Sequence, residues 1–422
     1  MKSLLKIYLC GIVCLLTLAV YCDVYDVTDY YQAGDISYAE AIVRAITAAN
    51  ANNGGVIYFP PGTYQVHQSI SVKKNLTIEG NSGPGGSSVI QATGSSTFNL
   101  FTCFNANASN VVFKNLVIDM NNLSGGGDVT GIGIYIHNDT NWTGANPVTG
   151  TRIENCEIKN GSSHGIRGFS TSTDCSVPFE LQIKNCKIHN CSLQGIFMQS
   201  GTSVVISGSE IYDCGQSAIY VMRGKNYVID SCNIRNVGYH GITVCYATNW
   251  KVVNNTVTNC ENWGICAGGG NSSLLHNTKY VISKNICLEN GWGGITIDPT
   301  LEGLPDYLCP SYGVVSKNIC SSSSLYHGIY INHPTNMIVK DNICHNNTHS
   351  GTLVYAKDCI ISNNIFSGVD PNNNQNGIYL TNTTDTENIL LDQNLIYKTY
   401  RTIYIADYVT NVFSSLSENL IP

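Results

Sequence analysis

Short runs of alternating apolar and polar residues follow one another along most of the chain. Ile153-Glu154-Asn155-Cys156-Glu157-Ile158 is a clear copy of one recurrent motif, in which apolar positions flank a polar stretch that carries Asn or Cys at one fixed place. Runs this short, separated by Gly, Asn and Ser, are typical of β-strands and leave little room for helices.

The fixed polar position marks a repeat. Copies from Cys186 to Asn255 are 23 residues apart, and longer spacings elsewhere indicate inserted loops. The eleven copies place this position at Asn115, Cys156, Cys186, Ser209, Cys232, Asn255, Asn285, Asn318, Asn342, Asn364 and Asn394.

A second signature, Gly-Ile followed by an alternating pair, comes some eight to ten residues later in many repeats, for example at Gly165-Ile166 and Gly241-Ile242. Three short strands in about 23 residues predict one coil of a solenoid. The fold class is therefore predicted as all-β, a single-stranded right-handed parallel β-helix of about eleven coils. Equivalent residues should then stack about 4.8 Å apart, so that the Asn residues form a hydrogen-bonded ladder.

The N-terminus contains two further predicted segments. Lys2, Lys6 and the apolar stretch from Leu9 to Val20 are typical of a signal peptide over residues 1–22, so we expect a secreted, extracellular protein without a membrane span in the mature chain. Residues 23–422 are predicted as one β-helix domain, with 23–80 as N-terminal cap and first coil. Within that cap, Ser37 and Glu40 form a capping box that opens a helix to about Asn50.

Composition narrows the range of partners. Charged residues make up 12% of the chain and the net charge is −7, which argues against a basic nucleic-acid binder. Of 18 cysteines, three lie in the predicted signal peptide, and the remaining odd number excludes complete disulfide pairing. No Cys-x-x-Cys pair occurs, so we interpret these cysteines as buried thiols and predict no metal site.

One stretch of the N-terminal region carries a family resemblance. Tyr25-Asp26-Val27, the predicted helix and the run from Gly54 to Tyr64, GGVIYFPPGTY, resemble the start of the pectate-lyase-like superfamily, closest to its rhamnogalacturonase-like and epimerase-like members. The resemblance implies a right-handed β-helix that acts on, or binds, acidic or complex polysaccharides. Some relatives use calcium or form trimers, so a calcium cofactor and a homo-oligomer stay open, although the sequence itself predicts neither.

The family's active-site motifs are not matched. Polygalacturonases of the hydrolase branch would show a Gly-His-Gly, where this chain has His-Gly-Ile at 164, 240 and 327. Alginate epimerases would show Asp-Pro-His-Glu, whereas the Asp298-Pro299 pair here is followed by Thr300. The resemblance therefore supplies a fold and a substrate class, but no catalytic residues.

Alternation along the Gly-Ile strands predicts which side chains face solvent. Long connections in some coils and short ones in others should leave a saddle between two walls, and such a concave patch is the default site. The predicted substrate-binding residues are His137, Phe197, Gln199, Thr243, Tyr246 and Asp298. The candidate catalytic residues are His164, Arg167, Tyr220, Arg223 and His240.

These residue types suit proton abstraction beside a uronate carboxyl group, which needs a base and a nearby cation. A glycoside hydrolase needs two facing carboxylates, and Asp298 is the one clearly offered. The leading hypothesis is thus a lyase or epimerase, with hydrolase next. The alternative is a non-catalytic polysaccharide-binding or adhesion protein, because Tyr also suits strands for its own sake and a His before Gly-Ile can simply bond a turn.

Overall fold

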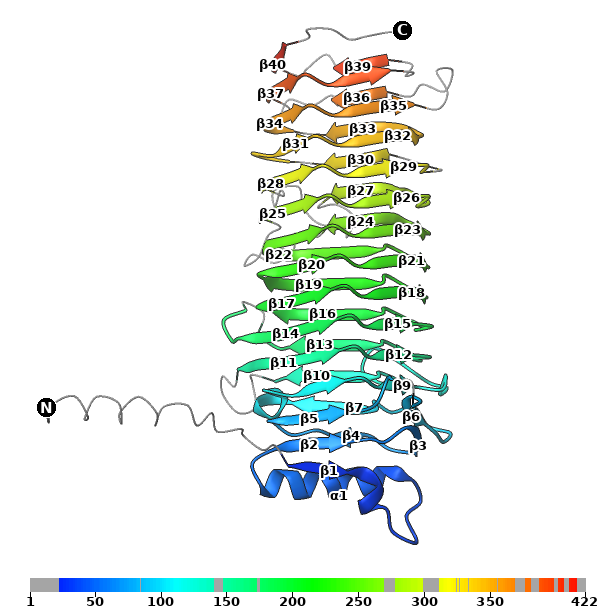
Figure 1. The fold of residues 1–422 in the computed structure, drawn as a ribbon. Coiled ribbons are helices and arrows are strands. Elements are labelled where there is room, and N and C mark those ends of the chain that lie inside the picture. The colour runs from blue at the N-terminus through cyan, green and yellow to red at the C-terminus, as the bar shows by residue number, and fades with distance from the viewer. Residues whose placement is uncertain are drawn as a thin grey trace, which may run out of the picture.

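The computed structural model describes residues 23–83, 85–139, 147–172, 175–268, 278–298, 311–323, 325, 327–332, 334–354, 356–368, 376–380, 387–397, 401–405 and 410–415. The predicted signal peptide lies outside these residues. Strands follow one another up a long column, with a single helix across the lower end (Figure 1).

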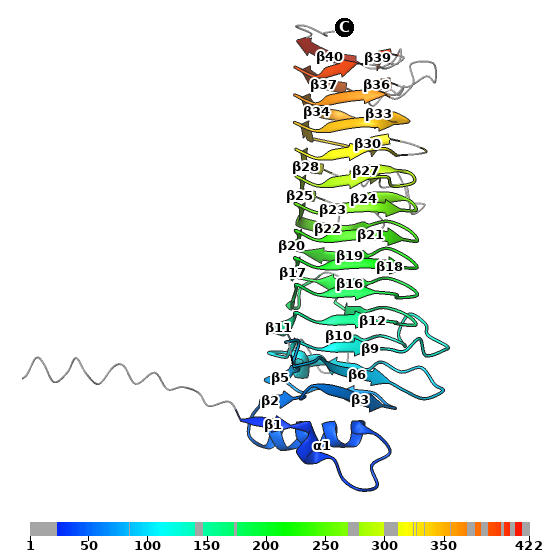
Figure 2. The ribbon, with the colours of Figure 1, turned by 45° about the vertical axis from the view of Figure 1, so that its right-hand side comes forward.

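Each regular coil contains three short strands, and every ladder between coils is parallel. In one coil the register pairs Ile196 with Ile219 on the first strand, and Val204 with Tyr227 on the second. Seen from the side, the coils are stacked directly over one another (Figure 2). The predicted parallel β-helix is confirmed.

The first strands, which carry the Gly-Ile signature, form one face of the column. They are β7 (Phe101–Phe104), β10 (Ile134–Asn138), β13 (Ile166–Ser170), β16 (Ile196–Gly201), β19 (Ile219–Lys225), β22 (Ile242–Val253), β24 (Trp263–Gly268), β27 (Gly293–Asp298), β30 (His327–Asn332), β33 (His349–Val354), β36 (Asn376–Leu380) and β39 (Arg401–Ile405), and β4 (Ile70–Ser71) precedes them.

The second strands continue in the same sheet, because β22 runs through both faces. They are β2 (Gly55–Tyr58), β5 (Leu76–Glu79), β8 (Val112–Lys114), β11 (Val148–Glu154), β14 (Phe179–Lys184), β17 (Ser203–Ser207), β20 (Tyr227–Asp230), β25 (Thr278–Ser283), β28 (Ser311–Ser316), β31 (Ile338–Lys340), β34 (Lys357–Ser362), β37 (Glu387–Asp392) and β40 (Thr410–Ser415), with β1 (Val24–Asp26) below β2.

The third strands form a separate sheet of 13 in the described part of the chain. They are β3 (Gly62–Val66), β6 (Ser88–Ala92), β9 (Val117–Asp119), β12 (Glu157–Lys159), β15 (Lys187–His189), β18 (Glu210–Cys214), β21 (Asn233–Val237), β23 (Thr256–Cys260), β26 (Ile286–Leu288), β29 (Ile319–Ser321), β32 (Ile343–Asn347), β35 (Ile365–Gly368) and β38 (Leu395–Tyr397). The eleven sequence repeats correspond to β9 through β38, and β3 and β6 add two coils whose corners lack the motif.

Buried asparagines join the coils at the corner between second and third strands. The amide Nδ2 of Asn285 donates to Oδ1 of Asn318 at 3.0 Å, and Asn318 donates to Asn342 at 2.9 Å. Each Nδ2 also donates to a backbone carbonyl, as from Asn318 to Ile282 at 2.9 Å. The same pattern links all six residues of the predicted ladder, Asn255, Asn285, Asn318, Asn342, Asn364 and Asn394.

Cysteines also stack inside the column. Cys287, Cys320 and Cys344 are in register on the third strands and have no exposed surface. Burial is the main cause that raises the pKa of the Cys320 thiol well above its usual value. All 14 cysteines in the described residues are buried, as the sequence predicted for thiols that pack as small apolar groups.

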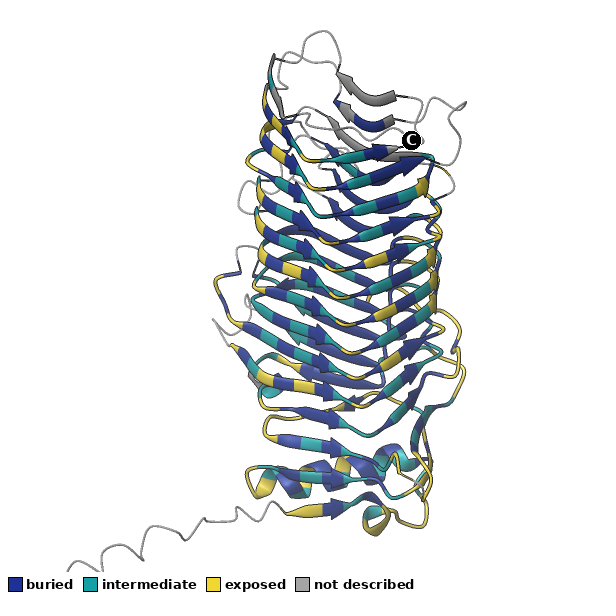
Figure 3. Cartoon of the chain, turned by 45° about the horizontal axis from the view of Figure 1, so that its top comes forward, coloured by how far each residue is buried: buried dark blue, intermediate teal, exposed yellow. Residues whose placement is uncertain are grey.

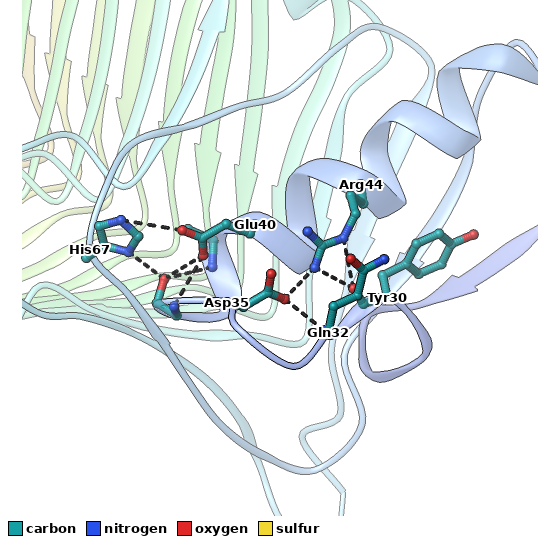
Figure 4. Close-up of polar contacts among 8 residues, drawn as sticks. Tyr30, Gln32, Asp35, Glu40, Arg44 and His67 are labelled. Atoms are coloured by element: carbon teal, nitrogen blue, oxygen red, sulfur yellow. Dashed lines mark hydrogen bonds and ion pairs between the residues drawn. The ribbon is translucent and has the colours of Figure 1, made fainter.

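The lower end is closed by α1 (Tyr38–Ala51), after the short 3₁₀ helix η1 (Val27–Tyr30). Both halves of the predicted capping box form: Ser37 Oγ accepts from the Ala39 N–H, and Glu40 accepts from the Ser37 N–H. Figure 4 shows His67 beside this box, with Nδ1 2.6 Å from Ser37 Oγ. The apolar side of α1, including Ile42 and Ile46, is buried against the first coils.

Candidate functional site

Side chains alternate along the first face as predicted. On β13 and β16, Ile166, Ile196 and Met198 point into the core and are fully buried. Figure 3 shows buried residues alternating with more exposed ones along many of the strands that face the viewer. The side chains between them point outward and stack from coil to coil. In register, this outward row contains Thr102, Tyr135, Arg167, Phe197, Tyr220, Thr243, Cys266, Thr296 and Tyr330.

Arg167 is the most unusual member of this row. Its guanidinium carbon lies 5.8 Å from the ring centroid of Tyr135, 5.5 Å from that of Phe169 and 5.0 Å from that of Phe197. The residue is only 5% exposed, and its Nε and Nη1 have no hydrogen-bond partner among the described residues. Burial lowers the pKa of Arg167, against the opposing effects of Tyr135 and Asp128.

Two histidines flank this arginine. His164 is 1% exposed; burial, and next the charge of Arg167, lower its pKa to about 3, so its ring is neutral near pH 7. The ring faces the Asp128 backbone and the Gln194 side chain, yet neither nitrogen makes a hydrogen bond of good geometry. His137 stacks on Tyr135 at 5.5 Å, and burial lowers its pKa as well. His164, Arg167 and His137 thus form one cationic-aromatic group on neighbouring coils.

A pocket of about 190 Å³ opens further along the same face. Its lining includes three predicted residues, Tyr220, His240 and Thr243, together with the thiols of Cys245 and Cys266. The volume is below the roughly 300 Å³ at which pockets begin to enclose drug-sized ligands. It therefore suits one unit of a longer molecule.

His240 has a structural role in this pocket. Its Nδ1 accepts a hydrogen bond from the backbone N–H of Trp263 at 3.2 Å, which fixes the imidazole between two coils. Burial lowers the pKa of His240 to about 3. The opposite side of the pocket is braced by a 3.0 Å hydrogen bond between Ser217 and Thr243.

Phe197 connects the arginine group to the pocket. Its ring stacks on that of Tyr220, with centroids 5.2 Å apart and planes 12° from parallel, and it also lies 5.3 Å from the His164 ring. Arg167 and Tyr220 are two coils apart, roughly 10 Å at the usual strand spacing. The structure thus brings His164, Arg167, Phe197 and Tyr220 onto one continuous surface.

Arg223 and Tyr246 lie at the corner where the first strands end. Both have positive φ, 60° and 54°, as does Ser200 one coil earlier, a conformation that is uncommon for such residues. Tyr246 packs with Cys175 and Cys245, and Tyr220 packs against that cluster. The Nε of Arg223 is buried and makes no hydrogen bond among the described residues.

Gln199 and Asp298 occupy the second outward row. Gln199 is half-buried beside Phe169 and Met222. Asp298 is five coils from Arg167, roughly 24 Å, and accepts a 3.0 Å hydrogen bond from Asn332. It therefore does not share a site with Arg167. Residues 140–146, 173–174, 269–277 and 299–310, which make up most of the predicted saddle walls, lie outside the described residues, so the saddle stays a prediction.

Sequence reasoning missed two residues next to the arginine group. Asp128 lies in the run Gly125-Gly126-Gly127-Asp128, inside the longest gap between repeats. That glycine run was the signal that the gap contains a structured loop. Gln194 faces His164, and its Nε2 donates to Gln216 Oε1 at 2.6 Å. Nothing in the local sequence distinguishes this glutamine from an ordinary surface residue.

Neither a metal site nor a membrane helix is found in the described part of the chain. No group of three or more His, Cys, Asp or Glu residues there could hold a metal ion. No helix there is long and apolar enough to cross a membrane. A calcium cofactor, which the family resemblance leaves open, is not tested by this observation.

Comparison with family models identifies the architecture. The model "Right handed beta helix region" matches residues 104–280 and 307–416, more than half of the chain. The chain belongs to the right-handed β-helix family. Residues 24–107 of this β-helix protein match a second model, "Rhamnogalacturonase A/epimerase, pectate lyase-like", which confirms the resemblance of the N-terminal region. No curated protein matches the chain significantly.

Solved structures show the same fold. The A-module of the Azotobacter vinelandii mannuronan C-5 epimerase AlgE4 is 18% identical, with 93% of this chain and 100% of that chain covered and a TM-score of 0.67. The Dettilon tailspike protein is 16% identical over 93% of this chain and 68% of that chain, with a TM-score of 0.60. An alpha-1,3-glucanase catalytic domain in complex with tetrasaccharides is 15% identical over 90% and 67%, with a TM-score of 0.57. At these identities the likeness concerns the fold of the β-helix protein.

Proposed function

We propose that this β-helix protein is secreted and acts on an extended, uronate-containing polysaccharide that lies along the first face, by lyase or epimerase chemistry. The observation that carries the proposal is the buried guanidinium of Arg167, which lacks a hydrogen-bond partner on two of its nitrogens in the described structure. Relatives of the same fold include a mannuronan epimerase and a glucanase bound to tetrasaccharides, which supports a carbohydrate as the ligand.

A buried charged group with unsatisfied hydrogen-bond donors is costly even beside aromatic faces, because its lost hydration is only partly compensated. A carboxylate is the ligand that best offsets this cost, since guanidinium donates two parallel hydrogen bonds to it. The rings of Phe197 and Tyr220, stacked at 5.2 Å, continue the surface and offer flat apolar contacts to neighbouring sugar rings. A chain of sugars with a carboxylate on at least one unit fits both features.

Such an arrangement prepares the carbon next to the carboxyl group for proton removal. Arg167 stabilises the negative charge that develops on the carboxylate, and the partly exposed imidazole of His137 on the neighbouring coil is the candidate base that accepts the proton. In a lyase, the bond between the next ring carbon and the glycosidic oxygen then breaks, a carbon–carbon double bond forms, and the proton taken up by the base passes to the leaving oxygen, directly or through water. In an epimerase, a proton returns from the opposite face of the ring, for which the Tyr220 hydroxyl is a candidate donor.

A product assay tests the proposal. Purified mature protein is incubated with a panel of uronate polymers, and unsaturated ends, reducing ends and sugar configuration are followed by absorbance, end-group chemistry and NMR. We expect unsaturated ends or inverted centres, and at least a tenfold loss in Arg167→Met. Arg235→Met is the matched control, because Arg235 is a surface arginine paired with Glu210 on the third-strand sheet. Reducing ends without unsaturation would overturn the proposal in favour of a hydrolase.

One observation favours a second candidate, a non-catalytic polysaccharide binder. His240, which lines the pocket, already accepts the Trp263 N–H, and the pocket lies two coils from Arg167. Binding that is retained with no product of any kind would establish this candidate.

A further inference from the structure

Aromatic and amide side chains alternate along the turns that lead into the first strands. Each lies three residues before the isoleucine that β19, β22, β24 and β27 bring into register, so they occupy consecutive coils. Their backbones are joined: the N–H of Asn262 donates to the Tyr239 carbonyl at 3.0 Å, and that of Trp292 donates to the Asn262 carbonyl at 3.1 Å. We call this row the lip; it consists of Gln216, Tyr239, Asn262 and Trp292.

Glycines keep the turns of the lip closely stacked. A Cβ at Gly238, just before Tyr239, would lie 2.4 Å from the Gly215 carbonyl oxygen, and one at Gly291, just before Trp292, would lie 2.1 Å from that of Glu261. Distances this short exclude any larger residue without movement. The two rings are therefore held on a rigid backbone ladder, two coils or roughly 10 Å apart.

Both rings of the lip present surface to solvent. Tyr239 is 48% exposed and Trp292 is 36% exposed, whereas Trp250 and Trp263 are 1% and 4% exposed. A single exposed ring needs no explanation, but two large rings at equivalent positions of a rigid ladder form a repeated flat surface.

The lip is continuous with the pocket of the first face. Gln216 and Tyr239 are among the residues that line the pocket, and the Tyr239 ring lies 4.0 Å from the ring of His240, centroid to centroid. A chain with one unit in the pocket therefore meets the lip directly, and Trp292 lies two coils beyond Tyr239.

The electrostatic surroundings of the lip differ from those of Arg167. A groove of about 670 Å³ runs along the other side of the same turns, and three carboxylates, Asp213, Glu261 and Glu289, are in its lining. The described linings of this groove and of the pocket contain no lysine or arginine. The negative potential of the carboxylates disfavours an anionic unit at the lip and does not affect a neutral one.

We propose that the lip is a subsite for uncharged sugar units, so that the substrate is a mixed polysaccharide with a uronate at Arg167 and neutral units past the pocket. The inference rests on the proposed function for the uronate, and on the lip itself for the neutral units. A sugar ring has an apolar face that covers an aromatic ring, and hydroxyl groups at its edge that match the amides of Gln216 and Asn262.

The distance along the column sets the length of ligand that the two places require. Arg167 lies on β13, and Trp292 precedes β27, five coils further along. A sugar unit is about as long as one coil is tall, so an oligosaccharide of about five units or more spans both.

The fluorescence of Trp292 tests the lip without any catalysis. The mature protein carries Trp142→Phe, which removes the fourth tryptophan, and it is titrated with a panel of carboxyl-reduced, neutral oligouronates of increasing length. We expect a blue shift of the emission that is lost in Trp292→Phe. No shift with any neutral oligosaccharide overturns the inference.

Substitution of the rings measures their contribution to binding. We expect Tyr239→Ala and Trp292→Ala each to weaken calorimetric binding of the neutral oligosaccharides by about three- to tenfold. Tyr31→Ala is the matched control, because Tyr31 is 45% exposed and follows η1 at the lower end of the column. Lip variants that bind like this control overturn the inference. So does self-association of the wild type that both lip variants abolish in sedimentation, because the lip would then join two copies of the chain.

The product assay separates this inference from the proposed function. We expect the wild type to act faster on polymers that mix uronate and neutral units than on pure polyuronates, and Tyr239→Ala and Trp292→Ala to lose that preference. Uronate products that form equally well in the wild type and in both lip variants would overturn the inference and leave the proposed function in place. Neutral oligosaccharides that shift the Trp292 emission, with no product from any uronate polymer, would sink the proposed function and leave the lip as a sugar subsite.

Discussion

Burial keeps the imidazoles of His164 and His240 uncharged in the folded chain, with pKa values near 3 instead of the usual 6.5. The unfolded chain therefore binds more protons between about pH 3 and 6.5, and the free energy of unfolding rises with pH across that window. Stability from these groups is complete above about 6.5 and is lost progressively as the pH falls.

Denaturant unfolding at a series of pH values checks this dependence. In His240→Gln the slope between pH 4 and 6 should decrease, because one of the two buried imidazoles is removed. His67→Gln, at the helix cap near the surface, serves as the comparison for the slope of His240→Gln. A slope identical to that of the wild type would mean that His240 is protonated in the folded state.

Phe197 is the residue that joins the arginine group to the pocket, through its stack on Tyr220. Aromatic contacts of this kind contribute about 0.5–1.5 kcal/mol beyond the area they bury. We expect Phe197→Ala to weaken binding of charged and neutral oligosaccharides alike by about three- to tenfold. Tyr312→Ala, an exposed aromatic on the second-strand face, is the control. Loss confined to the charged ligand would contradict the stacking role.

At the scale of the element, the asparagine ladder fixes the coils in register. Oδ1 of Asn318 accepts from both N and Nδ2 of Asn285, so Asn318→Ala leaves two buried donors without an acceptor. Each costs about 1–3 kcal/mol, so we expect a loss of at least about 2 kcal/mol in the free energy of unfolding.

Guanidinium unfolding measures that loss. Asn363, which precedes Asn364 of the same ladder, is exposed and has a φ of 55°, which glycine also adopts, so Asn363→Gly is a matched control that should change stability by less than about 1 kcal/mol. Equal losses of stability in Asn318→Ala and Asn363→Gly would mean that the side-chain hydrogen bonds of the ladder do not stabilise the fold.

The strand pattern and the ladder could be read from sequence because a residue in a β-helix meets its own equivalent in the next coil. The contact between Asn285 and Asn318 can be predicted because both residues occupy the same place in the repeat. The coil of β3 was predicted as the first coil within residues 23–80, but the coil of β6 was missed for the same reason, since its corner carries Gly80 in place of the motif. Positions that do not repeat give no such signal.

At the scale of the whole molecule, the buried cysteines predict a stability that does not depend on redox conditions. Since the 14 cysteines in the described residues are buried, and the stacked Cys287, Cys320 and Cys344 are free thiols, dithiothreitol should not shift the melting temperature. Labelling by a thiol reagent should be slow in the native state and rapid after unfolding. A melting temperature that falls on reduction would show that disulfides form in the purified protein.

The sequence predicted which face of the β-helix carries the candidate site, but not every residue that lies near Arg167. Alternation on the Gly-Ile strands placed Arg167, Phe197, Tyr220 and Thr243 in one row correctly. Asp128 could not be placed, because its position depends on how a glycine-rich loop packs on Ser162, a contact between unlike segments that leaves no periodic trace.

The asparagine ladder has a direction. From Asn255 to Asn364, each side-chain amide donates to Oδ1 of the Asn in the next coil as well as to a backbone carbonyl of the preceding coil. The ladder begins at Cys232, whose backbone N–H donates to Asn255 Oδ1 at 2.9 Å. A transplanted coil can therefore be inserted ahead of the ladder with almost any residue at its corner, whereas one appended behind it must bring an acceptor oxygen. Lengthening such a column by gene duplication is thus easier at one end than at the other.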